Sequence, residues 1–334
     1  MKQVVITKYG PPEVLQLREA PDPDPGPGEV RVKVAAAGIN FSDVLARQGL
    51  YPDAPKPPMV MGYEVAGTVD RVGGGVTIVR VGQRVVALTR FGGQSELIVA
   101  PTQRVFALPD DWTFEEGAAL PVTYLTAHHM LVRVAAAQPG ESVLVHAAAG
   151  GVGLAVAELG RILGLRVIGL ASTGKHDVLR EYGVEPLDSR NPAWPAAVRA
   201  LAPGGVDIAL DGVGGASWRQ DYSLLAPAGR LVLFGVSSLV TGTSRNVLRV
   251  LWQLIRFPRF GPLKLMNQNR TVAGVNVGHL AEPLLLPQFV ALEGYARAGK
   301  IRPRVDRRFG FNEAAAAHHH IHERKNIGKV VLVP

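Results

Sequence analysis

A glycine-rich turn between two apolar segments is the part of this chain whose residues most directly suggest chemistry. Residues 143–153 read Val-Leu-Val-His-Ala-Ala-Ala-Gly-Gly-Val-Gly, and an apolar helical pattern follows from Leu154 to Leu163. N–H groups at the start of a helix bind phosphate because they lack partners and lie at the positive end of the helix dipole. The pattern predicts a dinucleotide pyrophosphate site at Gly150, Gly151 and Val152. The spacing Ala-x-x-Gly-x-x-Gly differs from the usual Gly-x-Gly-x-x-Gly, so a turn without a ligand stays an alternative.

The next predicted strand ends without the acidic residue that selects NAD. It is followed by Ser172-Thr173-Gly174-Lys175, in which Ser172 can donate a hydrogen bond and Lys175 can supply positive charge. A carboxylate at this place would bind the ribose hydroxyl of NAD and repel a 2′-phosphate. We therefore predict NADP(H) rather than NAD(H), with a solvated lysine at a helix start as the alternative.

The elements around this turn alternate between strand and helix. Alternation of this kind predicts a doubly wound parallel sheet joined by right-handed crossovers. The six predicted strands span residues 142–146, 166–171, 184–187, 206–211, 230–235 and 271–276.

The first 120 residues have a different texture, with short β-branched runs separated by glycine and proline. Strands are predicted at residues 3–7, 29–35, 64–72, 84–88 and 96–99, and the closing segment returns to β-structure at 304–309 and 328–333. We predict an α/β protein in which residues 122–276 form a nucleotide-binding domain inserted into a mostly-β domain made of residues 1–121 and 277–334.

Composition narrows the class of protein further. Hydrophobic residues make up 47% of the 334 residues, charged residues 19%, and the net charge is +8, which is typical of a globular chain. We find no secretory signal, no apolar run of membrane-spanning length and no nucleic-acid motif, so we expect a cytoplasmic protein that does not bind nucleic acid. Cysteine is absent, which excludes disulfides and cysteine-ligated zinc.

Motifs along nearly the whole chain resemble the zinc-independent quinone oxidoreductase branch of the medium-chain dehydrogenase/reductase superfamily. Within that branch, the segment Phe234-Gly235-Val236-Ser237-Ser238 and others are most similar to homologues of vesicle amine transport protein. The motifs that carry the resemblance are Ala37-Gly38-Ile39-Asn40-Phe41-Ser42-Asp43, Gln48-Gly49-Leu50-Tyr51-Pro52, Met61-Gly62-Tyr63-Glu64-Val65-Ala66-Gly67, Asp211-Gly212-Val213-Gly214-Gly215, Val240-Thr241-Gly242 and Asn326-Ile327-Gly328-Lys329-Val330.

The resemblance implies a Rossmann domain inserted in a GroES-like catalytic domain, a homodimeric assembly, and hydride transfer from NADPH to a quinone or an α,β-unsaturated carbonyl compound. It places Asn40 beside the nicotinamide and Tyr51 in the substrate site. It also implies cofactor contacts at Thr123, Gly235, Ser237 and Asn326. Tyr63 stands where zinc alcohol dehydrogenases have a histidine ligand, so we expect no metal. Both tyrosines are candidate proton donors, although a buried tyrosine is more often a packing residue.

Two segments permit several interpretations. His318-His319-His320 with His322 resembles a metal cluster, but we favour a solvated helix face. Residues 244–265 interleave apolar and basic side chains. This basic segment could form a lobe over the active site, a dimer contact, or a weak contact with an anionic membrane. The last interpretation belongs to an alternative function, an NADPH-liganded binding or membrane-surface protein of the vesicle amine transport type with little turnover.

Overall fold

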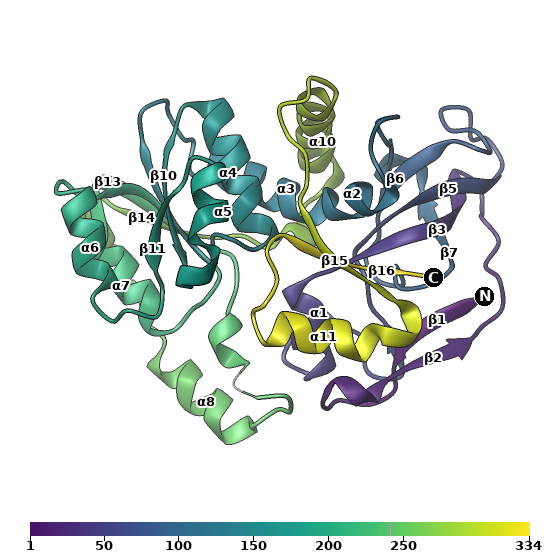
Figure 1. The fold of residues 1–334 in the computed structure, drawn as a ribbon, viewed down its shortest axis with the longest axis horizontal. Helices are drawn as coiled ribbons and strands as arrows, with labels where there is room; N and C mark the ends of the chain where they lie inside the picture. Colours follow the sequence, from purple (N-terminus) through teal and green to yellow (C-terminus); the bar gives the residue numbers. More distant parts are fainter. Residues whose placement is uncertain (241) are drawn as a thin grey trace.

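The structure is a computed structural model that describes residues 1–240 and 242–334. Thr241 lies outside the described residues, and with it the middle of the Val240-Thr241-Gly242 motif. The side chain of Arg249 is likewise not described. Two large β-sheets occupy the two ends of the molecule, with helices between and beside them (Figure 1).

One sheet has six strands in the order β11-β10-β9-β12-β13-β14, and every strand pair in it is parallel. The order reverses direction between β9 and β12, so this is a doubly wound sheet and the predicted Rossmann architecture is confirmed. The strands are β9 (Ser142–His146), β10 (Arg166–Ala171), β11 (Glu185–Asp188), β12 (Val206–Asp211), β13 (Leu225–Leu233) and β14 (Thr271–Gly274).

Helices follow most of these strands and cover the sheet. Every residue of β9 is buried. A parallel strand that is covered on both faces has no exposed side, which is why its sequence is a nearly continuous apolar run. The flanking helices are α3 (Pro121–His128), which continues as a π-helical turn over His129–Val134 (η3), α4 (Gly151–Leu163), α5 (His176–Glu181), α6 (Trp194–Leu201) and α7 (Ala216–Leu224).

The second large sheet has seven strands drawn from both ends of the chain. β16 pairs with β3, which also pairs with β5 and β7, and these pairs are antiparallel. The predicted joining of the two ends is therefore present, while the domain bounds at residues 121 and 277 stay a prediction. The strands are β3 (Glu29–Ile39), β5 (Glu64–Val72), β6 (Arg84–Leu88), β7 (Leu97–Pro101), β8 (Val105–Ala107), β15 (Val305–Gly310) and β16 (Lys329–Val333).

A small third sheet and several short elements complete the fold. The sheet joins β1 (Lys2–Ile6), β2 (Leu15–Glu19) and β4 (Met59–Val60), of which only β1 was predicted. The other helices are α1 (Phe41–Arg47), α2 (Phe114–Ala119), α8 (Val247–Arg256), α9 (Pro262–Gln268), α10 (Glu282–Arg297) and α11 (Ala314–His322). Among the described residues, no helix has the length and apolar character needed to span a membrane.

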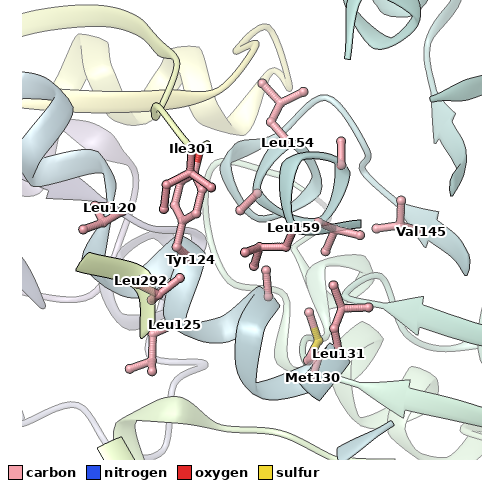
Figure 2. Close-up of a cluster of buried hydrophobic side chains, with 14 of the residues drawn as sticks. Leu120, Tyr124, Leu125, Met130, Leu131, Val145, Leu154, Leu159, Leu292 and Ile301 are labelled. Carbon is pink, nitrogen blue, oxygen red and sulfur yellow. The ribbon is translucent and has the colours of Figure 1, made fainter. Parts of the chain in front are cut away.

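An apolar core joins the two halves where α3, α4 and α10 meet (Figure 2). Its polar element is Glu158 on α4, which accepts a hydrogen bond from the Tyr124 hydroxyl at 2.5 Å and from the Arg302 N–H at 3.2 Å. The segment after α10 is thereby fixed to the nucleotide-binding half. Buried side chains in this core include Leu120, Leu125, Met130, Leu131, Val145, Leu154, Leu159, Leu292 and Ile301.

The interpretation of the histidine row as a solvated helix face is wrong for His318. This side chain is fully buried on α11, and burial lowers its pKa to about 3. Its neighbours contact carboxylates: His319 Nε2 lies 2.7 Å from Glu13 and His320 Nε2 lies 2.6 Å from Asp306. The row therefore packs α11 against the rest of the protein, which periodicity on the helix alone did not reveal.

Two helical glycines should respond oppositely to alanine. A Cβ on Gly153 in α4 would lie 2.2 Å from the Ala148 carbonyl oxygen, whereas a Cβ on Gly294 in α10 meets nothing within 4 Å. We expect Gly153→Ala to lower the free energy of unfolding by about 1–3 kcal/mol through the clash. Gly294→Ala should raise it by about 0.5–1 kcal/mol through helix propensity. Urea unfolding of both variants measures this, and stabilisation by both would contradict the close approach.

Candidate active site

A sharp turn carries the chain from β9 into α4. Ala147 has a positive φ of 52°, and Gly150 is the extended residue that precedes the helix. A Cβ on Gly151 would lie 2.8 Å from Thr123 Cγ2, so glycine is what allows Thr123 to approach the turn. The first N–H groups of α4, including those of Gly151 and Val152, have no partner within the helix and can bind an anion.

The segment that leads into β16 lies against this turn. The N–H of Gly328 donates to the Ala149 carbonyl at 2.8 Å, and Gly328 forms a parallel bridge with Gly150. Asn326 Nδ2 donates to the Gly328 carbonyl at 3.0 Å. The structure thus brings the predicted residues Gly150 and Asn326 together, although 176 positions separate them in the numbering.

Lys175 joins the same group of residues. It ends the short turn Thr173–Lys175 (η4), and its Nζ donates to the carbonyl oxygens of Arg324 at 2.7 Å and Asn326 at 2.6 Å. An ammonium group has three donors, so one remains for another acceptor. Lys175 therefore anchors the closing segment as well as supplying charge, a role that the sequence did not predict.

Charged groups of both signs lie near Lys175. Burial lowers the pKa of Lys175, Asp306 acts in the opposite direction, and Arg190 lowers this pKa further, which shows that a second cation is nearby. Ser172 stands between the end of β10 and η4, at the same strand end. The stretch Ser172–His176 contains no acidic residue that would repel an anion.

Asn40 precedes α1 and belongs to a buried polar network. Its Nδ2 donates to Glu64 Oε1 at 2.9 Å, and its Oδ1 accepts from Lys329 Nζ at 2.6 Å. Lys329 also forms a direct ion pair with Glu64. The exposed fractions are 0% for Glu64 and 4% for Lys329, so both of these opposite charges are buried in the folded protein. The Asn40 amide keeps one N–H and one lone pair for other partners.

This network reaches the glycine turn and α3. Glu64 Oε2 accepts from the N–H of Val122, the second residue of α3, at 2.7 Å. Lys329 Cδ lies 3.7 Å from the position that a Cβ on Gly151 would occupy. The predicted residues Asn40, Thr123 and Gly151 are therefore grouped around Lys329.

Asp43 is a second buried carboxyl group at the start of α1. Its oxygens accept from the N–H of Asn40 at 2.6 Å and from the N–H of Gly62 at 3.3 Å. Burial raises the pKa of Asp43 to about 7, while Lys329 lowers this pKa and Glu64 raises it. Asp43 thus fixes the distance between α1 and the segment that carries Tyr63 and Glu64.

The two predicted catalytic tyrosines lie next to each other. The ring centroids of Tyr51 and Tyr63 are 6.2 Å apart in an edge-on arrangement, and Tyr63 also contacts Phe91 at 5.6 Å. The Tyr63 hydroxyl is buried and forms no hydrogen bond of ordinary geometry, with Ser42 and Tyr51 beside it. Burial raises the pKa of both tyrosines, and Asp43 raises that of Tyr63 further, so both hydroxyls stay neutral donors at neutral pH.

Gly235 and Ser237 follow β13, two strands from β9 along the same carboxyl edge of the sheet. The N–H of Ser237 donates to the Gly212 carbonyl at 3.0 Å. Farther along the chain, the Gly242 carbonyl accepts a hydrogen bond at 2.7 Å from Nε2 of Gln48, the residue that follows α1. These two predicted cofactor residues therefore lie in a segment that connects the nucleotide-binding sheet to the mostly-β half.

One group among the described residues has metal-ligating side chains close together. His146, Asp211 and Asp221 are all buried, with their ligand atoms within 4.8 Å of one another. His146 Nε2 lies 2.9 Å from Asp221, and Asp211 accepts from the N–H groups of Val213 at 2.5 Å and Gly214 at 3.1 Å. These bonds give the group a structural explanation, since His146–Asp221 holds α7 against the end of β9 and Asp211 orders the loop after β12.

Three residues of the network were missed as site residues by sequence reasoning. Glu64 and Lys329 appeared in motifs of the resemblance, and Asp43 closed another, but nothing in their spacing showed that they meet. The signal that was available is chemical: Glu64 in β5 and Lys329 in β16 are charged residues in strands that are otherwise largely apolar. Charges in such positions are normally paired when buried.

A doubly wound sheet with this glycine turn, joined to a β-domain built from both ends of the chain, defines the class of medium-chain dehydrogenases and reductases. Residues 26–110 match the family described as "Alcohol dehydrogenase GroES-like domain", and residues 183–332 match "Zinc-binding dehydrogenase". The first match lies within the mostly-β half, and the second runs from β11 of the parallel sheet into β16 of the seven-stranded sheet.

Relatives of known description indicate the branch of this superfamily to which the chain belongs. The chain is 36% identical over 340 residues to a quinone oxidoreductase of Pseudomonas aeruginosa, covering 100% of this chain and 99% of that one. It is 40% identical over 306 residues to the human synaptic vesicle membrane protein VAT-1 homolog, covering 90% and 77%. Against the zebrafish homolog the identity is 38%, and the chain spans 62% of that protein's length. The chain belongs to the quinone oxidoreductase branch of the medium-chain dehydrogenase/reductase superfamily.

Solved structures agree over the whole chain. A mycobacterial protein complexed with NADPH is 33% identical with a TM-score of 0.87, and each chain covers 100% of the other. The CurK enoyl reductase is 27% identical with a TM-score of 0.87, covering 99% of this chain and 98% of that one. The GroES-like and Rossmann assignments are therefore confirmed at the level of the fold.

The Glu64–Lys329 pair should show a strong energetic coupling. Lys329→Met leaves the Glu64 carboxylate buried without its counter-ion, so we expect the free energy of unfolding to fall by about 3–5 kcal/mol. Adding Glu64→Gln removes that stranded charge and should recover part of the loss. Urea unfolding of the two single variants and the double variant measures the coupling, and strictly additive losses would show that the pair does not interact.

Proposed function

We propose that this protein is an NADPH-dependent, zinc-independent oxidoreductase that reduces quinones or α,β-unsaturated carbonyl compounds. The observation that carries the proposal is the convergence of the Gly150–Gly153 turn, the segment Asn326–Lys329 and Asn40 around one buried ion pair. The names of the relatives support it, since they include a quinone oxidoreductase, an enoyl reductase and a protein solved with NADPH.

The residues present fit NADPH. The N–H groups at the start of α4 suit the pyrophosphate, and the free donor of Lys175 together with Ser172 and Arg190 suits the 2′-phosphate. Zinc fits poorly at the place where its ligands would stand. The chain has no cysteine, and Tyr63 occupies the position expected of a histidine ligand. The Asn40 amide is already bonded to Glu64 and Lys329.

NADPH, when bound, supplies the hydride that such a reduction requires. The protein's own part is positioning and proton supply. The hydrogen bonds to Glu64 and Lys329 fix the orientation of the Asn40 amide. Its remaining N–H and lone pair are thereby held ready for a bound cofactor or substrate. The Tyr63 hydroxyl, which burial keeps neutral, is the first candidate donor to a substrate oxygen. Tyr51 stands beside it as the second neutral donor, which suits protonation of an enolate or hydroquinone anion.

Steady-state reduction of a quinone series and an enone series with NADPH and with NADH tests the proposal. We expect turnover with NADPH, and we expect Lys175→Ala to lower kcat/KM for NADPH on the order of tenfold or more, with a much smaller effect on NADH. Lys300→Ala, which removes an exposed lysine after α10, is the charge-matched control.

One outcome would contradict the role of Lys175 in cofactor choice, and another would contradict the enzymatic activity. Equal losses with both cofactors would mean that Lys175 acts through the Arg324 and Asn326 carbonyls alone. Tight NADPH binding without turnover in either substrate series would remove the enzymatic assignment and leave a binding protein.

A second candidate function is attachment to an anionic membrane surface, and the observation that favours it is the exposed face of α8. Leu248 is 80% exposed and Ile255 76%, and Arg256 stacks over the ring of Trp252 at 3.8 Å. An apolar face bordered by cations is typical of helices that lie in a membrane interface. The basic segment, residues 244–265, contains α8 and the first part of α9.

Vesicle sedimentation measures this candidate function. We expect binding to vesicles that contain phosphatidylglycerol and loss of that binding in the variant Leu248→Ser with Ile255→Ser. The control variant Leu286→Ser with Val290→Ser removes two apolar side chains of α10 that are 47% and 58% exposed. Equal sedimentation of both variants, or no sedimentation of the unaltered protein, would dismiss the membrane contact.

A further inference from the structure

A cavity lies away from the glycine turn, between α7, α9 and the loop before α9. Its volume is about 620 Å³, and we call it the α7–α9 cavity. The residues that line it are Arg219, Tyr222, Ser223, Pro258, Arg259, Phe260, Lys264, Gln268 and Arg270. Four of these nine carry positive charge and none carries negative charge.

The positive charge of this cavity is not balanced by the surrounding sequence. From residue 222 to residue 281 the chain contains seven arginine and lysine residues and no aspartate or glutamate. Within the described part of the chain, Arg219, Arg259 and Lys264 form no ion pair. Arg270 differs, because its guanidinium donates to the carbonyl oxygens of Tyr222 at 2.8 Å and of Leu225. Like charges held together in one concave place repel each other unless an anion joins them.

The floor of the cavity is aromatic. The Tyr222 ring lies 5.1 Å from Lys264 Nζ, 5.3 Å from the Arg270 guanidinium and 5.1 Å from the Phe260 ring. These contacts orient both cations against a rigid surface.

Tyr222 is the buried part of the lining. Its side chain is 4% exposed, and its hydroxyl is buried without a hydrogen-bond partner among the described residues. The Tyr222 ring rather than the hydroxyl therefore contributes to the cavity, as a surface on which the cations lie.

The α7–α9 cavity is separate from the proposed cofactor site. Tyr222 and Ser223 stand at the C-terminal end of α7, and Arg270 directly precedes β14, so the cavity lies at the amino edge of the parallel sheet. The glycine turn follows β9 at the carboxyl edge. In doubly wound sheets the dinucleotide occupies the carboxyl edge, so it does not reach this cavity.

We infer that the α7–α9 cavity binds the phosphate group of an anionic ligand. Arginine matches phosphate oxygens in a bidentate manner, and lysine adds a compact charge. This chemistry is shared by soluble phosphate monoesters and by the headgroups of anionic phospholipids. The site is independent of the reductase activity, and its ligand belongs to the phosphate class in either case.

Calorimetric titration with glycerol 3-phosphate tests the inference on the full chain. We expect saturable binding that weakens on the order of tenfold or more in Arg259→Gln with Lys264→Gln, since two charged contacts are lost. Arg256→Gln with Lys300→Gln removes the same charge outside the cavity and should bind like the unaltered protein. The glycine turn is intact in all of these proteins, so their differences report on the cavity.

Competition then separates the two sources of phosphate. Displacement of glycerol 3-phosphate by phosphatidylglycerol vesicles, but not by phosphatidylcholine vesicles, supports a lipid headgroup as the ligand. Retention of glycerol 3-phosphate in the presence of both vesicles supports a soluble ligand. The inference is overturned if no saturable binding occurs, or if the cavity variant and the control variant bind equally.

Discussion

The buried ion pair between Glu64 and Lys329 is the constraint on which the site depends. Burying two charges is expensive, and the cost is offset only when every remaining polar atom finds a partner. Here the Glu64 carboxylate accepts hydrogen bonds from Lys329, Asn40 and the N–H of Val122. This one carboxylate therefore links a strand from each end of the chain to the start of α3. The orientation of Asn40 follows from this arrangement.

Much of the fold could be predicted because its signals are local. β9, β10 and β12 have the predicted bounds, since strands covered on both faces are short apolar runs bounded by turn residues. The short strands β2, β4 and β8 were missed because their pairing depends on neighbours distant in sequence. The network around Lys329 was missed for the same reason: its two charged residues are 265 positions apart, and no periodic pattern records such a contact. His318 was misassigned because helix spacing says which residues share a face, but not which face is buried.

The site also shows two different uses of positive charge. Lys329 is neutralised by a carboxylate in the interior, while Lys175 stays half-buried and is held by main-chain carbonyls that carry no net charge. The first arrangement fixes geometry, and the second keeps a cation available to an anion. The same distinction holds in the α7–α9 cavity, where Arg270 is tied to carbonyl oxygens while Arg259 and Lys264 are not paired.

The bridge between Gly328 and Gly150 has a consequence for biosynthesis. A ribosome completes the six-stranded parallel sheet, whose last strand ends at Gly274, well before it adds β16. During that interval the glycine turn lacks its partner segment, Lys175 lacks the Arg324 and Asn326 carbonyls, and Glu64 lacks its counter-ion. The site is therefore complete only after the last residues of the chain have been added, and these residues join the two halves of the molecule.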